Sequence, residues 1–151
     1  MENLILSIGI GLGVSLLFAE FFGLAAGGMI VPGYFALYLH KPGAVLFTLG
    51  AAFATYLIVR LLSSAMIIYG KRRTVLMILT GYLIGLALPR LLPGVPFFPG
   101  EGDSRVIGYI IPGLIAIWLD RQGIVETLST LAVASAAVRL VLILILGDIA
   151  V

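Results

Sequence analysis

Two arginines, Arg60 and Arg139, stand inside long apolar stretches, with aliphatic residues on both sides of each. An arginine in the middle of a membrane costs on the order of 2.5–3.5 kcal/mol on insertion scales, so it normally faces a cavity or a partner. The alternative is that its long side chain extends to the lipid headgroups. These two positions therefore predict either anion binding or anchoring at the membrane surface.

Two Pro-Gly steps, Pro32-Gly33 and Pro112-Gly113, lie within two short apolar segments. Proline cannot continue a helix from upstream, but it is tolerated at a helix start. Each segment is therefore expected to be a loop that leads into a half-helix beginning near the proline. Such a helix directs unpaired N–H groups and the positive end of its dipole into the membrane, where transporters use them to hold carboxylates. The alternative is that both steps are kinks buried against neighbouring helices.

The other charged residues offer pairing or surface contacts rather than catalysis. Glu20 closes the first long apolar stretch and could pair with one of the two arginines or lie at the interface. The densest basic run is Lys71-Arg72-Arg73. The sequence has no cysteine, one histidine and no Walker-type loop, and its bases form no stripe typical of nucleic-acid binding. We therefore expect no catalytic residue, metal or cofactor in this chain, and no nucleic-acid partner.

The composition predicts an all-α integral membrane protein. Of the 151 residues, 62% are hydrophobic and 11% are charged, and the mean hydropathy is +1.23. Soluble domains have about 45–50% apolar and about 25% charged residues. A membrane-spanning helix needs about 20 apolar residues. The stretches that approach or exceed this length are 4–22, 44–69, 75–92 and 124–146.

The two short segments, 27–39 and 107–119, contain the Pro-Gly steps. Each has only about a dozen residues, a length that favours a re-entrant half-helix over a full crossing. The expected fold therefore has four transmembrane helices and two Pro-Gly-broken re-entrant segments.

The short segments are copies of one another. Positions 28–43 align with 108–123 at an offset of 80, with seven of sixteen residues identical. Gly-x-x-x-Gly patterns that begin at Gly9 and Gly81 precede the two copies, at an offset of 72. Such faces let helices approach closely, within one chain or between protomers. We therefore predict an internal twofold duplication within one membrane domain, with a first repeat at 1–70 and a second at 71–151.

The charges predict an orientation in the membrane. The positive-inside rule places Lys71-Arg72-Arg73 on the cytoplasmic side, and the loop that carries Glu101 and Asp103 then lies outside. If the short segments are re-entrant, the two repeats are parallel; if they cross, the repeats are inverted. Their brevity favours the first arrangement. We expect a multi-pass protein of the cell (cytoplasmic) membrane.

Four longer motifs, spread over nearly the whole chain, resemble one known family. They are Phe18-Ala19-Glu20, Val31-Pro32-Gly33-Tyr34, Met66-Ile67-Ile68-Tyr69-Gly70-Lys71-Arg72-Arg73 and Arg105-Val106-Ile107-Gly108-Tyr109-Ile110-Ile111-Pro112-Gly113-Leu114-Ile115-Ala116. In this order they are similar to the CapC/PgsC family, the small membrane subunits of bacterial poly-γ-glutamate capsule synthesis. The loop at 93–102 is richer in proline and glycine than is usual for that family.

The resemblance implies a membrane subunit with no autonomous enzymatic activity. It implies a CapB/PgsB-type partner ligase, which uses ATP and Mg²⁺ to join glutamates through the γ-carboxyl, and a CapA/PgsA-type subunit at the outer surface. ATP and Mg²⁺ are then expected on the ligase and not in this chain. Because four helices enclose only a narrow pore, we also expect a homo-oligomer.

Together, the residues and the resemblance lead to two hypotheses. In the first, the protein guides poly-γ-glutamate, a polyanion, through the lipid bilayer. The candidate residues for its path are Arg60, Arg139, Pro32, Gly33, Pro112, Gly113 and Glu20. In the second, the protein is a non-conducting scaffold that anchors and activates the ligase. The candidate docking residues are then Lys71, Arg72 and Arg73.

Overall fold

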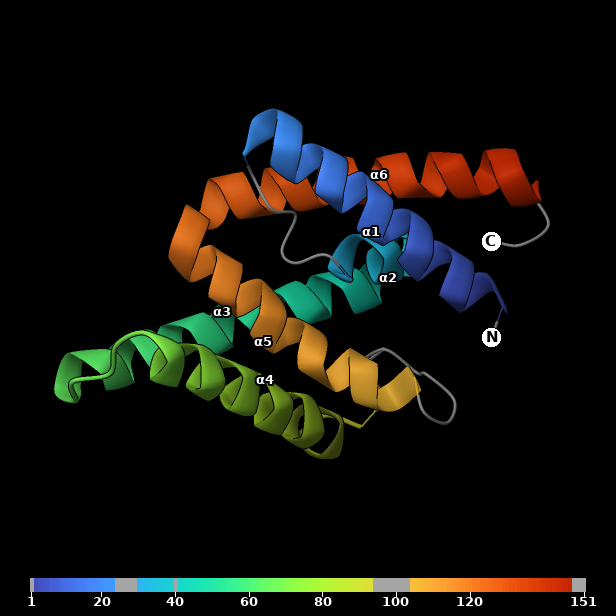
Figure 1. Cartoon of the computed structure of the whole chain (residues 1–151). Helices are drawn as coiled ribbons and strands as arrows, with labels where there is room; N and C mark the ends of the chain where they lie inside the picture. Colours follow the sequence, from blue (N-terminus) through green and yellow to red (C-terminus); the bar gives the residue numbers. More distant parts are fainter. Residues whose placement is uncertain (1, 24–29, 40, 94–103, 148–151) are drawn as a thin grey trace. The chain divides into compact units, whose positions relative to one another are not determined.

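The computed structural model describes residues 2–23, 30–39, 41–93 and 104–147, which form six helices and no strand (Figure 1). The helices are α1 (Glu2–Phe22), α2 (Val31–Tyr38), α3 (Pro42–Ala65), α4 (Lys71–Leu91), α5 (Ser104–Gln122) and α6 (Ile124–Leu146). Four of them, α1, α3, α4 and α6, are long and apolar enough to cross a membrane. Each overlaps one of the four predicted spans, so the all-α class is confirmed, as is the presence of four helices able to span a membrane.

The two short segments differ in where the proline lies within the helix. α2 has eight residues and carries proline in its first turn, as predicted. α5 has 19 residues and begins at Ser104, so that Pro112 lies inside it. The predicted half-helix beginning near Pro112 is therefore wrong. An internal proline removes one backbone hydrogen bond, which membrane helices tolerate because neighbouring groups satisfy or cover the freed carbonyl.

The length of α5 also bears on its course. A helix of 19 residues rises about 28 Å, close to the roughly 30 Å of a hydrocarbon core. Brevity is therefore no longer an argument against a crossing by this segment. The re-entrant course remains a prediction for α2, and the choice between parallel and inverted repeats stays open.

Two glycines redirect the chain between helices. Gly70 precedes α4 with a φ of 66°, and Gly123 precedes α6 with a φ of 104°. Residues with a Cβ atom rarely adopt this left-handed region, so glycine is the residue that permits each turn. A glycine therefore stands directly before the first residue of both α4 and α6.

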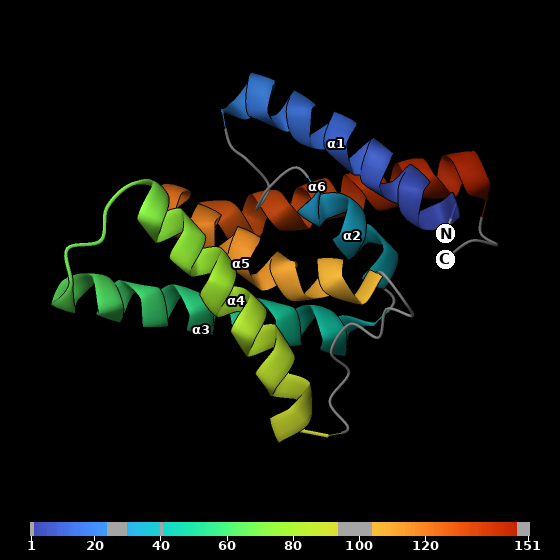
Figure 2. The ribbon, with the colours of Figure 1, turned by 60° about the horizontal axis from the view of Figure 1, so that its bottom comes forward.

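The chain divides into two compact units (Figure 2). Unit 1 comprises Met1–Pro42 and Arg121–Val151, and unit 2 comprises Gly43–Asp120. Unit 1 thus contains α1, α2 and α6, and unit 2 contains α3, α4 and α5. The third helix of the first predicted repeat, α3, lies in the unit that contains α4 and α5. The third helix of the second repeat, α6, lies in the unit that contains α1 and α2. The predicted repeat boundaries stay a prediction, because these units divide the chain differently.

In unit 1, α1, α2 and α6 pack against one another. Their core consists of Ala36, Val138 and Leu142, with Ile10, Val14 and Leu37 beside them. A close approach joins Gly11 of α1 to Gly33 of α2, where a Cβ atom added to Gly11 would stand 2.6 Å from the Gly33 Cα atom. The Ser7 hydroxyl also donates a 2.5 Å hydrogen bond to the Gly33 carbonyl oxygen. The Pro-Gly step of α2 is therefore a tight helix contact.

Unit 2 has a contact of the same kind between α4 and α5. Its core includes Val59, Met77 and Ile117, with Ile78 beside them. A Cβ atom added to Gly81 would stand 2.5 Å from the Gly113 Cα atom, and one added to Gly85 would stand 3.2 Å from the Tyr109 Cα atom. The predicted close-packing face at Gly81 and Gly85 is therefore confirmed.

The predicted register of the first helix needs correction. A Cβ atom added to Gly9 would meet nothing within 4 Å, whereas Gly11 packs on its Pro-Gly step as Gly81 does on the other. The contacts thus match Gly11 with Gly81 at an offset of 70 (81 − 11), and not Gly9 with Gly81 at 72. The Gly-x-x-x-Gly pattern gave the wrong register because it depends only on spacing along one helix. Which glycine is needed for close packing depends on where the backbone of the partner helix lies. The duplication itself remains a prediction.

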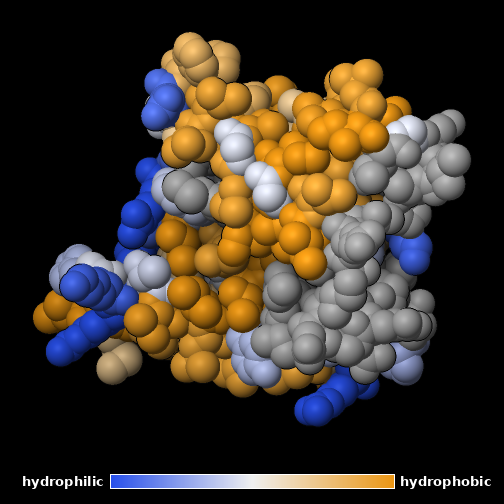
Figure 3. Space-filling model, turned by 45° about the vertical axis from the view of Figure 1, so that its right-hand side comes forward, coloured by the Kyte–Doolittle hydropathy of each residue, from blue (hydrophilic) through white to orange (hydrophobic). Residues whose placement is uncertain are grey.

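The outer surface of the described residues is strongly apolar. Side chains such as Phe21, Ile67 and Leu144 are 78%, 86% and 85% exposed. Figure 3 shows one face of the molecule, on which apolar residues cover most of the coloured surface. Exposed apolar surface of this extent is typical of contact with lipid or with other protein chains.

Candidate functional site

Arg60 is held by a residue of its own helix. It lies in α3, five residues before the helix ends at Ala65, or about 8 Å at 1.5 Å per residue. Its Nη1 atom donates a hydrogen bond to the Tyr56 hydroxyl, and its guanidinium carbon lies 5.7 Å from the centre of the Tyr56 ring. The side chain is exposed. These contacts, near the end of a long helix, favour the anchoring interpretation for Arg60.

Arg139 has a different environment. It lies in α6, and its Nη1 atom is buried with no hydrogen-bond partner among the described residues. Ser135, four residues earlier, is 2% exposed, and its hydroxyl likewise has no partner within that part of the chain. A buried polar group without a partner costs about 1–3 kcal/mol, and a charged one costs more. α6 therefore holds two buried polar groups, one turn apart, that an anion would satisfy.

Sequence reasoning had not singled out Tyr56 or Ser135. The signal that would have found them is their position, since each lies four residues before an intrahelical arginine. Residues four apart are neighbours on a helix surface. Tyr56 accepts a hydrogen bond from Arg60, whereas Ser135 accepts none from Arg139 Nη1.

The other predicted path residues are not part of this pair. Glu20 is exposed on α1 and forms no ion pair with Arg139. Gly33 and Gly113 are buried, and each lies in close contact with a neighbouring helix of its unit. Their prolines, Pro32 and Pro112, are buried as well. The Pro-Gly steps therefore have the environment of the alternative interpretation, in which they are packed against neighbouring helices.

One residue of the basic run at the start of α4, Arg73, forms an ion pair that was not predicted from the sequence. Arg73 Nη2 lies 2.5 Å from a carboxylate oxygen of Asp120 in α5, and both side chains are about three-quarters buried, with 25% and 23% exposed. A cation near a helix N-terminus and an anion near a C-terminus are each unfavourable with their own helix dipole. Pairing offsets both. Lys71 and Arg72 remain exposed in the first turn of α4, so they are the docking candidates that present charge outward.

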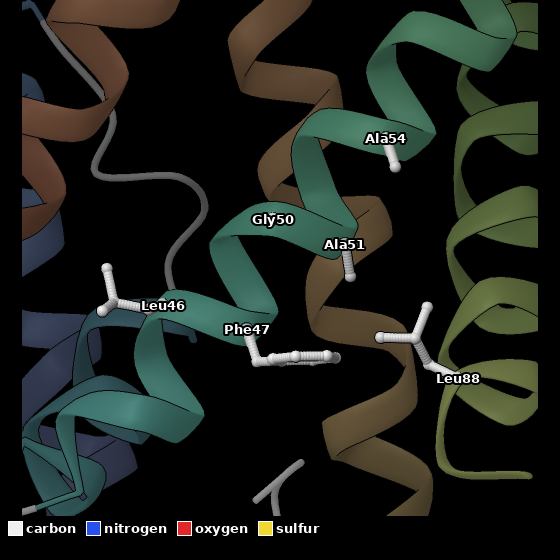
Figure 4. A pocket seen from close by; sticks show the side chains of 6 residues that line it. All are labelled: Leu46, Phe47, Gly50, Ala51, Ala54 and Leu88. Carbon is white, nitrogen blue, oxygen red and sulfur yellow. The ribbon is translucent and has the colours of Figure 1, made fainter. Parts of the chain in front are cut away.

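The hollows of the two units are mainly apolar. In unit 2, a hollow of about 270 Å³ lies between α3 and α4, with Phe47 and Leu88 pointing toward one another across it (Figure 4). Its other lining residues are Leu46, Gly50, Ala51 and Ala54. In unit 1, a hollow of about 230 Å³ is lined by Phe18, Phe22, Ser129, Thr130 and Val133. Such linings suit acyl chains better than a polyanion, so the Ser135–Arg139 pair is the stronger candidate for anion binding.

Comparison with known proteins decides the family. The profile of the family described as Capsule biosynthesis CapC matches residues 10–128. The chain belongs to this family. The predicted resemblance is therefore confirmed. The match ends before Ser135 and Arg139, so it carries no information on that pair.

Two relatives agree with the assignment to the CapC family. The chain is 38% identical to the PGA biosynthesis protein CapC of Bacillus subtilis (strain 168) over 137 residues, which cover 90% of this chain and 91% of that protein. It is 36% identical to the Capsule biosynthesis protein CapC of Bacillus anthracis, with the same coverage. No solved structure matches the chain.

Proposed function

We propose that this chain is the membrane subunit of a poly-γ-glutamate synthesis and export complex, and that it guides the anionic polymer through the cell membrane. Membership of the CapC family and the name of the Bacillus subtilis relative support the role in polymer synthesis. The observation that carries the guiding role is Arg139, whose guanidinium has one buried nitrogen with no partner among the described residues, in a helix long enough to span a membrane.

The chemistry of the polymer explains why a cation is needed. Each residue of poly-γ-glutamate keeps a free carboxylate, which is ionised at neutral pH because an ordinary glutamate-type pKa is about 4.3. Moving an unpaired carboxylate into hydrocarbon is very unfavourable. A fixed guanidinium offsets this cost through charge-assisted hydrogen bonds. Passage also requires that each carboxylate leave again, so one cation with few additional donors suits the task.

The proposal includes partners and an assembly. A CapB/PgsB-type ligase, with its ATP and Mg²⁺, supplies polymer from the cytoplasmic side, and a CapA/PgsA-type subunit receives it outside. This chain contributes no catalytic residue. Because the hollows described above are mainly apolar, a hydrated path requires several copies of the chain or its partners, and we propose a homo-oligomer. The matching contacts at Gly33 and Gly113 support the internal duplication.

A second candidate function is the non-conducting scaffold. The observation that favours it is the exposure of Lys71 and Arg72 in the first turn of α4. α4 has no acidic residue in that turn, so its positive dipole end and these bases together attract an acidic surface. The ligase would dock there, and the polymer would leave by another route.

One experiment separates the two functions. A Lys71→Gln/Arg72→Gln double variant and an Arg139→Gln variant are each produced with the full complex. Membrane-bound ligase and polymer in the medium are then measured. The guiding role predicts that Arg139→Gln retains the ligase but exports less polymer. Normal export by Arg139→Gln, together with loss of ligase from the double variant, establishes the scaffold instead.

A further inference from the structure

We infer that Ser135 and Arg139 form a carboxylate-binding site on α6, and that Arg60 is not its equivalent. The inference rests on the proposed function for the identity of its ligand, the side-chain carboxylate of a γ-linked glutamate chain. It assigns to the two intrahelical arginines different functions, which the sequence alone did not distinguish.

Helix geometry brings the two side chains together. Cβ atoms four residues apart lie about 5–6 Å from one another, and helical side chains lean toward the N-terminus of their helix. The Arg139 side chain therefore extends toward the turn that carries Ser135. In α3 the corresponding contact is present. Arg60 extends toward the residue four positions earlier and donates a hydrogen bond to the Tyr56 hydroxyl.

The difference between the two helices is the length of that earlier side chain. Tyr56 carries its hydroxyl at the far end of a ring and so satisfies Arg60. Ser135 carries its hydroxyl on a single carbon atom. Within the described residues, both the Ser135 hydroxyl and Arg139 Nη1 are buried and unpartnered, so they do not bond each other. A group that accepts hydrogen bonds from both donors would satisfy the two atoms together.

Other hydroxyls of α6 behave differently from Ser135. Ser129 and Thr130 donate to the carbonyl oxygens of Val125 and Glu126, four residues earlier. This is the usual bond of a hydroxyl within a helix. Ser135 forms no such bond, although it is more deeply buried than Thr130, at 2% against 6% exposed. Its donor therefore has no partner among the described residues, one helical turn from Arg139.

A carboxylate meets these requirements. It has two oxygen atoms and accepts several hydrogen bonds. One oxygen accepts from Arg139 Nη1–H and the other from the Ser135 hydroxyl, and the guanidinium balances the negative charge. A phosphate of a lipid headgroup has the same acceptor chemistry, so the experiment must distinguish these two sources.

Because the chain contains no cysteine, a single introduced thiol can report on the site. Ser135→Cys is placed in the full chain in phosphatidylcholine vesicles and treated with an anionic, water-soluble methanethiosulfonate reagent, which reacts with thiolates. The control is Val133→Cys, since Val133 lies on the same helix but is 56% exposed. The probes are a decamer of γ-linked glutamate and its methyl ester.

The site predicts that Ser135→Cys reacts and that the acidic decamer, at about ten times its Kd, slows this reaction about tenfold, as simple occupancy requires. The methyl ester gives no protection, and the decamer does not protect Val133→Cys. Protection is lost when Arg139→Gln is added, and it is kept when Arg60→Gln is added.

Absence of reaction, absence of protection, or protection that survives Arg139→Gln overturns the inference. So does slow reaction in vesicles containing phosphatidylglycerol without decamer, because a headgroup then occupies the site.

A second measurement covers failure of the cysteine variant to fold. Binding of a fluorescent decamer to the chain carrying native Ser135 in lipid nanodiscs is followed by anisotropy, with Arg139→Gln and Arg60→Gln compared. Equal affinity in the two variants overturns the inference. Specific binding at Arg139 combined with normal polymer export by Arg139→Gln contradicts the proposed guiding role and leaves the site in place, so the two failures are distinguishable.

Discussion

Gly11 of α1 lies so close to Gly33 of α2 that a Cβ atom added to Gly11 would stand 2.6 Å from the Gly33 Cα atom. The neighbour is backbone and cannot rotate away. We predict that Gly11→Ala destabilises the protein by about 1–3 kcal/mol, the usual cost of overpacking. Thermal unfolding in detergent, followed by circular dichroism, measures this.

Gly9→Ala is the matched control for Gly11→Ala. A Cβ atom at Gly9 meets nothing within 4 Å, and alanine favours a helix over glycine by about 1 kcal/mol. Gly9→Ala should therefore leave the unfolding temperature unchanged or raise it. Equal losses of stability in both variants would show that the α1–α2 contact is placed incorrectly.

The Arg73–Asp120 pair predicts a second stability effect. Asp120→Asn removes the charge that balances Arg73, a largely buried side chain whose Nε atom already has no partner in the described structure. We expect a loss of about 1–3 kcal/mol, because the asparagine oxygen still accepts a hydrogen bond but no longer balances the charge of Arg73, measured as thermal unfolding in the same detergent. The exchanged double variant Arg73→Asp/Asp120→Arg should recover part of it. An Asp120→Asn variant as stable as the wild type would show that the pair contributes nothing.

Removing the contact between Arg60 and Tyr56 is predicted to change polymer export very little. Tyr56→Phe removes the hydroxyl that accepts from Arg60 but keeps the ring beneath the guanidinium. Because Arg60 is exposed, water can replace the lost acceptor, and interactions of exposed charges contribute little. We expect exported polymer to stay within about twofold of wild type in Tyr56→Phe and in Arg60→Gln. A large loss of export in both variants would place Arg60 on the polymer path after all.

The four long helices could be predicted from the sequence because their signal is local. About 20 consecutive apolar residues are sufficient to identify a membrane span, and each predicted span overlaps one helix of the structure. The start of α2 at its proline was also predicted correctly.

The features that failed depend on the partner helix. Pro112 does not end α5, because tertiary surroundings tolerate its missing hydrogen bond. Gly11 rather than Gly9 is the packing glycine, because the α2 backbone lies against it. The pairing of Arg73 with Asp120 joins two helices, 47 positions apart in the chain. The different environments of Arg60 and Arg139 became visible only once burial and hydrogen bonding were known.

The most direct measurement of the guiding role uses inverted membrane vesicles that contain the complete complex. Given ATP, Mg²⁺ and glutamate, they should make new polymer and move it into the lumen, where an added γ-glutamyl hydrolase cannot reach it. We predict that Arg139→Gln vesicles still make polymer but leave most of it open to the hydrolase, whereas Arg60→Gln vesicles protect as much as wild type. If Arg139→Gln vesicles protect the same fraction of new polymer as wild type, Arg139 does not guide the polymer.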